Sequence, residues 1–343
     1  MARTVLHLVG SSVDAFHAEL SALYARGCLA ALGDRYDHRV AYVSPGGKWQ
    51  FPLDLTPAAL ADAPLVETAA AVAYLEQLDV SVAVPQMFCL PGMTSYRSLL
   101  YALDIPFIGN PASVMAIAAD KARTREVVAA AGVRVPEGRV VHDETPVDLA
   151  LPVVVKPVAE DNSVGVTLVR ETSDYRGAVR DALTHGDAAL VESYVELGRE
   201  VRCGTVVRDG ELDCLPLEEY AVDSVRQKAD KLARHDDGSL YLVAKDDERA
   251  WIVDCEDPIT QRVWDVACGA HEALGCRHYS LFDFRIDPNG EPWFLEAGLY
   301  CSFAPTSVIA VMAAAAGIPV EQLFADTVAE LDHERSVECT TPR

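Results

Sequence analysis

The chain has 343 residues, and 29 Lys and Arg stand against 52 Asp and Glu, so its formal net charge is −23 at pH 7. A surface this acidic repels phosphate backbones and anionic lipids at long range, so we expect neither nucleic acid nor a membrane as a partner. Half of the residues are hydrophobic and 24% are charged, which is typical of a folded chain and excludes disorder as its main character. The length predicts two or three domains.

The cysteines and the N-terminus bear on the cellular compartment. Nine cysteines are scattered along the chain without a Cys-x-x-Cys pair, and an odd number cannot all be bridged. This usage is typical of buried thiols in a reducing compartment. The first residues carry no cleavage-site pattern, and no run approaches about 18 apolar residues. We therefore expect a cytoplasmic protein.

The first hundred residues alternate short apolar runs with helical patterns. Strands are expected at 5–9, 39–43 and 80–84, and helices at 15–32 and 95–103. Strands that alternate with helices favour a parallel sheet. The sequence therefore predicts an N-terminal α/β domain over residues 1–105 with a Rossmann-like parallel sheet.

The rest of the chain changes to hairpins and longer helices. Asn110 is expected to cap a helix whose first residue is Pro111, and Lys121 to begin a second helix that Gly132 ends. Beyond them we expect strands at 153–156, 164–170, 188–195, 201–207, 211–217, 280–287 and 291–297, and helices at 173–184, 258–274, 306–316 and 320–331. The tail after His333 is predicted to fray.

Residues 221–250 are dense in charges of both signs. Two interpretations stay open for this segment: a solvated loop, or a mobile lid. A lid would exclude water from a reactive intermediate.

The segment from Leu281 to Glu296 indicates two strands joined by a tight turn at Asn289 and Gly290. With a two-residue turn, Asp283 lies directly opposite Glu296, and two carboxylates on one sheet face make an oxygen cage for Mg²⁺. With a three-residue turn at 288–290, Glu296 faces away, and only a bulge restores the pair. The sequence alone leaves both turns open. The alternate residues are expected in a core: Phe282, Phe284 and Ile286.

Two lysines and a polar loop have the residue types that bind a phosphate group. Lys156 ends an apolar strand, where a lysine is costly unless it meets an anion. The loop from Glu160 to Gly165 is small and polar, so its backbone N–H groups and the Ser163 hydroxyl are suited to surround a phosphate. Lys121 opens a helix upstream. Taken singly, most such lysines are surface residues and most such loops are simple turns.

Two glutamates follow in the next strands. Glu192 lies in the apolar run 190–195, and Glu200 comes eight residues later. The backbone N–H and C=O groups of such a strand can hydrogen-bond adenine, and a carboxylate can accept hydrogen bonds from the ribose hydroxyls. Taken alone, Glu200 is better explained as an exposed strand residue.

The order and spacing of these motifs are better evidence for a function than any single motif. In chain order they are Pro106-Phe107-Ile108-Gly109, Asp120-Lys121, Arg125, Gly132, Pro152 to Pro157, Glu160 to Gly165, Glu192, Asp283 and Leu295-Glu296. This series resembles the ATP-grasp superfamily and, within it, the D-alanine–D-alanine ligase family. The resemblance implies an α/β ATP-grasp fold: the N-terminal domain, then two α+β lobes, 106–190 and 191–335, that clamp ATP. The second lobe would carry the metal site and the lid at 221–250, and the family suggests a homodimer.

The resemblance also implies a role for each site residue. The ATP phosphates would be held by Lys121 and Lys156, under a covering loop that contains Glu160, Ser163 and Gly165. The adenine pocket would be lined by Glu192, Tyr194 and Val195, and the ribose bound by Glu200. One or two Mg²⁺ ions, or Mn²⁺ in their place, would be bound by Asp283 and Glu296. On closure of the lid, the γ-phosphate would be reached by Lys228 or Lys231.

Members of the family activate a carboxylate as an acyl phosphate, which an amine then attacks. Little proton chemistry is visible here while cations and carboxylates are plentiful, which suits phosphoryl transfer because it depends on positioning and charge neutralisation. Arg285, two residues beyond Asp283 on the same strand face, is the candidate donor to the oxyanion of the tetrahedral intermediate. Ser307 matches the family serine near the second amino acid.

The sequence departs from the family at substrate-facing positions. Gly298 stands where the family has a metal-binding asparagine, and Leu281 where it has an arginine. Three aromatic residues offer more apolar surface than a D-alanine pocket needs: Phe88, Tyr300 and Phe303. The ATP-facing residues therefore match the family better than the substrate-facing ones.

We therefore predict an ATP-dependent carboxylate–amine ligase that joins two amino acids into a dipeptide or γ-glutamyl-type amide of a specialised amino acid, releasing ADP and phosphate. One alternative is genuine D-alanine–D-alanine ligation in cell-wall synthesis. Another is a non-catalytic ATP-binding regulator, which Gly298 favours, whereas the retained Lys156, Asp283 and Glu296 argue against it. Substrate-dependent formation of ADP distinguishes an enzyme from a regulator.

Overall fold

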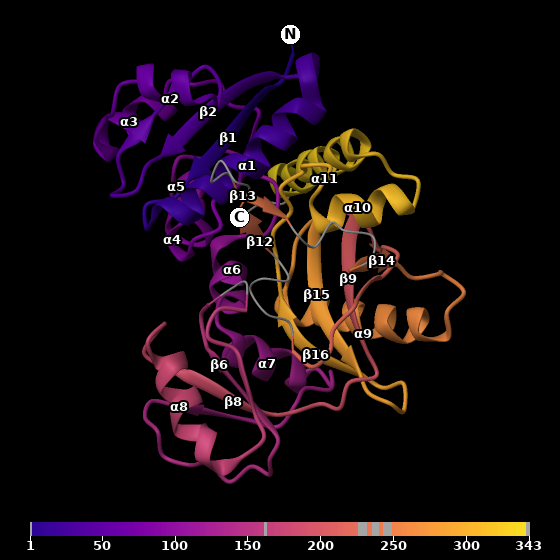
Figure 1. The fold of residues 1–343 in the computed structure, drawn as a ribbon. Helices are drawn as coiled ribbons and strands as arrows, with labels where there is room; N and C mark the ends of the chain where they lie inside the picture. Colours follow the sequence, from indigo (N-terminus) through magenta and orange to yellow (C-terminus); the bar gives the residue numbers. More distant parts are fainter. Residues whose placement is uncertain (1, 161–162, 226–231, 235–239, 243–248, 341–343) are drawn as a thin grey trace.

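The structure is a computed structural model that describes residues 2–160, 163–225, 232–234, 240–242 and 249–340. Its strands form three larger sheets, one N-terminal, one central and one C-terminal (Figure 1). In the view of Figure 1, the N-terminal sheet lies at the top, the central sheet with its helix at the bottom, and the C-terminal sheet beside them. Each sheet contributes residues to a hydrophobic core.

The N-terminal sheet has the order β3-β2-β1-β4 and is parallel except at one edge. Its strands are β1 (Thr4–Gly10), β2 (Asp37–Val43), β3 (Trp49–Gln50) and β4 (Val82–Pro85), with β3 antiparallel. The helices of this part are α1 (Ala15–Leu32), α2 (Pro57–Asp62), α3 (Thr68–Leu75), α4 (Leu90–Met93) and α5 (Ser95–Ala102), with a 3₁₀ turn at Gly33–Arg35. The predicted parallel sheet is confirmed.

The connection after this sheet differs from the prediction at its cap. α6 (Ala112–Ala118) begins after Pro111, and the Asn110 side chain does not cap it. Its amide nitrogen donates to the carbonyls of Tyr279 and Leu299, both at 3.0 Å. Because two buried carbonyls of the C-terminal part need donors, Asn110 serves as a tie to that part.

The central sheet is antiparallel, with the order β5-β8-β6-β7. Its elements are β5 (Gly138–Val141), β6 (Val153–Pro157), β7 (Thr167–Val169), α8 (Thr172–Leu183) and β8 (Ala189–Ser193). The sheet therefore extends to Ser193, past the predicted lobe boundary at residue 190. The helices α6 and α7 (Lys121–Ala130) fall within the predicted first lobe, 106–190, but they pack against α9 (Pro258–Leu274) of the C-terminal part.

The C-terminal sheet has the order β14-β11-β9-β15-β16. Its strands are β9 (Arg199–Arg208), β11 (Glu218–Tyr220), β14 (Ala250–Ile252), β15 (Tyr279–Ile286) and β16 (Pro292–Ala297), and β10 (Glu211–Cys214) forms a hairpin with β9. Phe282, Phe284 and Ile286 are buried with the apolar residues of α9, as predicted. Leu281 packs instead into a core shared with the N-terminal sheet.

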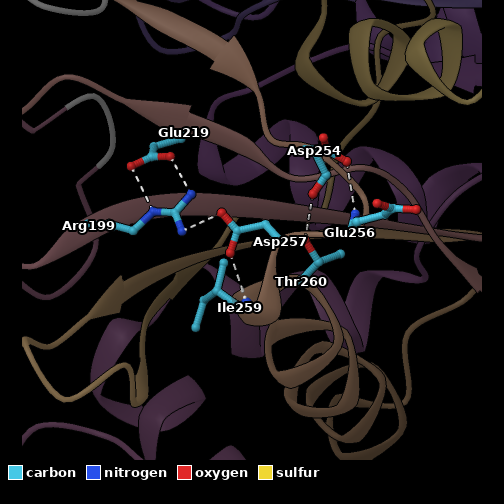
Figure 2. Close-up of polar contacts among 7 residues, drawn as sticks. All are labelled: Arg199, Glu219, Asp254, Glu256, Asp257, Ile259 and Thr260. Carbon is cyan, nitrogen blue, oxygen red and sulfur yellow. Dashed lines mark hydrogen bonds and ion pairs between the residues drawn. The ribbon is translucent and has the colours of Figure 1, made fainter.

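An arginine fixes the start of β9, one residue before Glu200 (Figure 2). Arg199 forms a two-point pair with Glu219 of β11, at 2.9 and 2.6 Å, and its third nitrogen lies 2.8 Å from Asp257. The other oxygen of Asp257 caps α9 by accepting from the Ile259 amide at 3.0 Å. Two strands and a helix are thereby joined at one point, because a two-point charged pair constrains both position and orientation.

The last helices cover the sheet on the side away from α9. They are α10 (Val308–Ala315) and α11 (Val320–Thr340). The expected fraying after His333 is wrong: the helix continues, and Glu334 lies 3.3 Å from His278 Nε2 and 3.5 Å from Arg277 Nη1. Within the described part of the chain, no single helix is both long and apolar enough to cross a membrane. The helices at 308–315 and 320–337, which are bent against each other, reach the required length and apolar composition only when they are taken together.

Part of the charged segment 221–250 is described. β12 (Leu232–Arg234) and β13 (Leu240–Leu242) pair as an antiparallel hairpin, and β13 lies against α1. The hairpin thus connects the C-terminal part to the N-terminal one (Figure 1). The predicted site residues Lys228 and Lys231 lie outside the described residues.

Candidate active site

A cleft lies between the central and C-terminal sheets, with about 780 Å³ of empty space when the solvent at its open mouth is included. Ten of the residues predicted from the sequence line it: Lys121, Lys156, Glu160, Ser163, Glu192, Val195, Glu200, Asp283, Arg285 and Glu296. The fold therefore gathers into one cleft residues that are up to 175 positions apart in the sequence.

Three other predicted residues do not line the cleft. Gly165 has a φ of +66°, and a Cβ there would lie 2.9 Å from Pro157, so this position needs glycine for its backbone and its packing. The guanidinium groups of Arg285 and Arg170 both lie over the Tyr194 ring, at 5.3 and 5.7 Å from its centre. Ser307 precedes α10, and its buried hydroxyl has no hydrogen-bond partner among the described residues.

Lys156 and Glu192 form a buried ion pair on one wall of the cleft. Lys156 Nζ lies 2.6 Å from Glu192 Oε2, and Arg125 Nε lies 3.8 Å from the other carboxylate oxygen. β6 and β8 pair so that Val154 is opposite Glu192, which puts Lys156 diagonally across from it on the same face. The lysine predicted for a phosphate is thus held by the glutamate predicted for adenine, and a bound nucleotide would compete for both.

Lys121 links the polar loop to the acid pair. Its Nζ donates to the backbone carbonyl of Glu160 and lies 3.6 Å from Glu296 Oε2. The Lys121 side chain is only 9% exposed, so its charge acts in a region where water screens weakly. The Lys121 ammonium group lies between the loop and Glu296, and this position suits an anion that extends from one to the other.

Asp283 and Glu296 are direct cross-strand partners on β15 and β16. Near the turn, Arg285 pairs with Trp293 and Phe284 with Phe294, which is the register of the three-residue turn. The register then shifts by one residue between Phe284 and Asp283. A bulge therefore restores the acid pair, as one of the two open alternatives required.

Arg285 lies among the nucleotide-binding candidates. Its Nη2 is 2.5 Å from Glu200 Oε2, and its Nη1 donates to the Val195 carbonyl at 3.3 Å. Its buried Nε has no partner among the described residues. These contacts place the guanidinium with Glu200, Val195 and Tyr194, so the geometry does not favour the predicted role of Arg285 as an oxyanion donor.

The sequence motifs did not reveal Arg202, which lies on β9 directly opposite Asp283. Its Nε and Nη2 donate to the two oxygens of Asp283, the second at 3.1 Å. Its guanidinium also lies over the Tyr220 ring, at 5.2 Å. A signal was present in the sequence, because an arginine between Val201 and Cys203 is as costly in an apolar strand as Lys156 is.

The aromatic residues predicted for the substrate side divide into two groups. Phe88 lies 5.1 Å from Tyr300 and 5.4 Å from Tyr24, ring centre to ring centre, so α1 and the loop after β16 share an aromatic cluster. Phe303 is fully buried against Tyr279 and Phe324. Phe303 is therefore a core residue, and its proposed place at a substrate is wrong.

The donor set fits a divalent cation only in part. Two carboxylates on neighbouring strands suit Mg²⁺, which usually takes one or two carboxylates together with substrate phosphates and water. Among the described residues no group of three or more His, Cys, Asp or Glu side chains is placed to hold a metal ion. The residues present therefore fit an ion that arrives with a nucleotide.

Comparisons with known sequences point to one family. The family model described as D-ala D-ala ligase C-terminus matches residues 133–329. The D-alanine–D-alanine ligase of Gluconobacter oxydans is 35% identical over 234 residues, which are 66% of this chain and 72% of that protein. The D-alanine–D-alanine ligase of Methylobacterium radiotolerans is 34% identical over 236 residues, 66% of this chain and 73% of that protein.

Solved structures agree on the fold. The VanG D-Ala:D-Ser ligase from Enterococcus faecalis superposes with a TM-score of 0.78 at 19% identity, over 96% of this chain and 100% of that chain. The D-alanine–D-alanine ligase from Coxiella burnetii gives a TM-score of 0.77 at 17% identity, over 98% of this chain and 96% of that chain. At these identities the likeness establishes the architecture alone.

The family model over more than half of the chain and the curated relatives, together with the three-sheet fold, define an ATP-grasp protein, a ligase that uses ATP to form a carbon–nitrogen bond. The family model and the curated relatives narrow the class further. The chain belongs to the D-alanine–D-alanine ligase family.

Proposed function

We propose that this protein joins two molecules of D-alanine into a dipeptide at the expense of ATP, releasing ADP and phosphate. The observation that carries the proposal is the single cleft in which Lys121 and Lys156 face Asp283 and Glu296. Curated relatives at 34–35% identity are D-alanine–D-alanine ligases, which supports this substrate over the specialised amino acid predicted from the sequence.

The first step would form an acyl phosphate. A carboxylate oxygen of the first D-alanine attacks the γ-phosphorus of ATP, and the bond to the β–γ bridging oxygen breaks as ADP leaves. Lys121 and Lys156 neutralise phosphate oxygens, and the loop that contains Glu160 and Ser163 covers them. Mg²⁺ or Mn²⁺, held by Asp283 and Glu296, would supply Lewis-acid charge neutralisation at the transferred group.

The second step would form the peptide bond. The deprotonated amine of the second D-alanine attacks the acyl carbon, and the C–O bond to phosphate breaks as inorganic phosphate leaves. The oxyanion of the intermediate needs a cation or N–H donors close by. Arg202, held beside Asp283, is better placed for this charge than Arg285, which is engaged with Glu200.

A second candidate keeps the reaction but changes the acceptor amino acid. The Phe88, Tyr300 and Tyr24 cluster supports it, because these tilted and edge-to-face rings favour a ligand with apolar surface. The fold is also shared with a solved D-Ala:D-Ser ligase, which uses a different second amino acid.

A matrix of paired amino acids tests the proposal. The purified protein is given MgATP and pairs drawn from D-alanine, D-serine, L-alanine and bulky D- and L-amino acids, and ADP release and product mass are measured. Fastest turnover with D-alanine alone supports the main proposal, and a faster bulky acceptor supports the second candidate. No amino-acid-dependent ADP with any pair would favour a non-catalytic regulator. Lys156→Met is the inactive control, and Lys48→Met, at an exposed surface lysine, is the matched active control.

A further inference from the structure

Arg202 places a positive charge directly beside Asp283. The two residues are direct partners across β9 and β15, and the guanidinium contacts both oxygens of the carboxylate. The exposed fractions of the side chains are 15% and 12%. A two-point pair of opposite charges in such a shielded place is strong and holds its geometry.

Other groups hold the guanidinium in the same position. The Tyr220 ring lies under it at 5.2 Å, and Nη1 donates to the Tyr220 hydroxyl at 3.4 Å. An arginine guanidinium stays protonated in proteins. Arg202 is therefore a permanent cation, and these contacts hold it in place before any ligand binds.

The strand that carries Asp283 brings no cation of its own to this place. Leu281, two residues before Asp283, is buried in the core shared with the N-terminal sheet, beside Tyr279 and Phe303. Arg285, two residues after it, is bound to Glu200. The only arginine of β9 or β15 in contact with the acid pair is therefore the one on β9, within the residues that the structure describes.

The ligands for divalent ions are correspondingly few. Two of the roughly four lone-pair sites of Asp283 are used by Arg202. Glu296 Oε2 lies 3.6 Å from Lys121 Nζ. Gly298, after the end of β16, has no side chain to offer. What is left suits one ion bound by carboxylates and nucleotide phosphates, and not a pair of ions.

We propose that Arg202 supplies the second positive charge of the reaction site, so that the protein binds one divalent ion per nucleotide where two carboxylate-bound ions would otherwise be needed. This inference rests on the proposed function, because it presupposes that a nucleotide binds in the cleft. Arg202 then faces the transferred phosphoryl group as a fixed cation, which costs no reorganisation during the reaction.

The absence of a side chain at position 298 is not forced by packing. A Cβ on Gly298 would lie 3.8 Å from Leu281 Cδ2 and 4.0 Å from the Leu281 carbonyl oxygen, which are ordinary contacts. A side chain can therefore begin at this position without a clash at its Cβ. A double variant that removes Arg202 and adds an asparagine there is expected to convert the site to two ions.

The test counts bound Mn²⁺ by electron paramagnetic resonance. Each protein is saturated with a non-hydrolysable ATP analogue, whose bound amount is measured separately by equilibrium dialysis. We expect one Mn²⁺ per bound analogue in the natural protein and in Gly298→Asn, because Arg202 still holds Asp283. The double variant Arg202→Gln/Gly298→Asn is expected to bind two.

Controls separate the outcomes. Arg208→Gln removes an arginine from the same strand, one that is paired with Asp326 at 2.9 Å outside the site, and should still bind one ion. Two Mn²⁺ per analogue in the natural protein would overturn the inference and leave the proposed function standing. No analogue bound by the natural protein would overturn the proposed function itself. If the double variant does not fold, the number of Mn²⁺ ions that the natural protein binds per analogue still tests the inference.

Discussion

Asp283 and Glu296 face each other because Leu295 is the extra residue of a bulge on β16. Without it, the register set by the three-residue turn would put Leu295 opposite Asp283 and turn Glu296 to the other side of the sheet. The acid pair thus depends on a local irregularity in the strand.

Glu296 is the better member of this pair to remove. Glu296→Gln should lower kcat/KM about 100-fold or more, since a ligand of the metal is worth several kcal/mol to the transition state. Asp283 is less informative, because its loss also leaves Arg202 buried and unpaired. Glu291→Gln, just before β16 and partly exposed, is the matched control and should keep normal rates. Steady-state ADP release checks both, and an unchanged Glu296→Gln would contradict the metal role.

The Lys156–Glu192 pair serves both stability and binding. Lys156→Met should lower the free energy of unfolding by about 3 kcal/mol, because it leaves Glu192 charged and buried. Lys156→Met/Glu192→Leu should recover most of that loss while still failing to bind nucleotide. Denaturant unfolding and nucleotide titration measure the two effects. Arg180→Met, which removes an exposed pair with Glu144, should change stability by less than about 1 kcal/mol. Nucleotide binding by the double variant would exclude a phosphate role for Lys156.

Arg285 distinguishes nucleotide binding from catalysis. With Arg285→Met/Glu200→Gln, which avoids an unpaired buried glutamate, we expect the KM for ATP to rise about tenfold or more while kcat at saturating ATP changes little. Loss of an oxyanion donor would instead lower kcat about 100- to 1,000-fold. A steady-state comparison at several ATP concentrations separates the two. A fall in kcat alone would restore the role predicted from the sequence.

Two buried histidines make stability depend on pH. Burial lowers the pKa of His271 to about 4, and burial with the neighbouring His38 lowers the pKa of His7 to about 3. Both are therefore neutral in the folded chain while an unfolded histidine becomes charged below about pH 6.5. Their contribution is complete above about pH 6.5 and is lost as the pH falls toward the folded-state values.

The histidine prediction is tested by one substitution. Between pH 7 and pH 5, the natural protein should lose about 2 kcal/mol more unfolding free energy than His271→Asn, which has no proton to take up. Denaturant unfolding at the two pH values measures this. Equal losses in both proteins would mean that folding does not lower the pKa of His271.

The segment 221–250 is proposed to act as a lid. Its described hairpin, β12 and β13, lies against α1, the helix that also contributes to the aromatic cluster of Phe88 and Tyr300. Trypsin should cut within the segment in the free protein and spare it when an ATP analogue and D-alanine are present. Mass spectrometry locates the cuts, with cleavage elsewhere in the chain as the internal control. Equal cutting in both states would remove the lid role.

Much of the site was predictable because its residues violate the rules of their surroundings. A lysine at the end of an apolar strand, or acids alternating with Phe282 and Phe284, can be recognised locally, and most of these residues line the cleft. Asn110 shows the limit. Its position before Pro111 is typical of a helix cap, but its amide serves carbonyls of Tyr279 and Leu299, which lie far along the chain.

The sequence by itself determined the parallel N-terminal sheet, the family and the set of charged residues available to a nucleotide, since each depends on local pattern and order. Only the tertiary structure decided which charges meet. Arg202 is 81 positions from Asp283 and was invisible as its partner, and the sequence did not reveal that Arg285 pairs with Glu200. Strand register is a long-range property, and a shift of one residue reverses the side to which every side chain points.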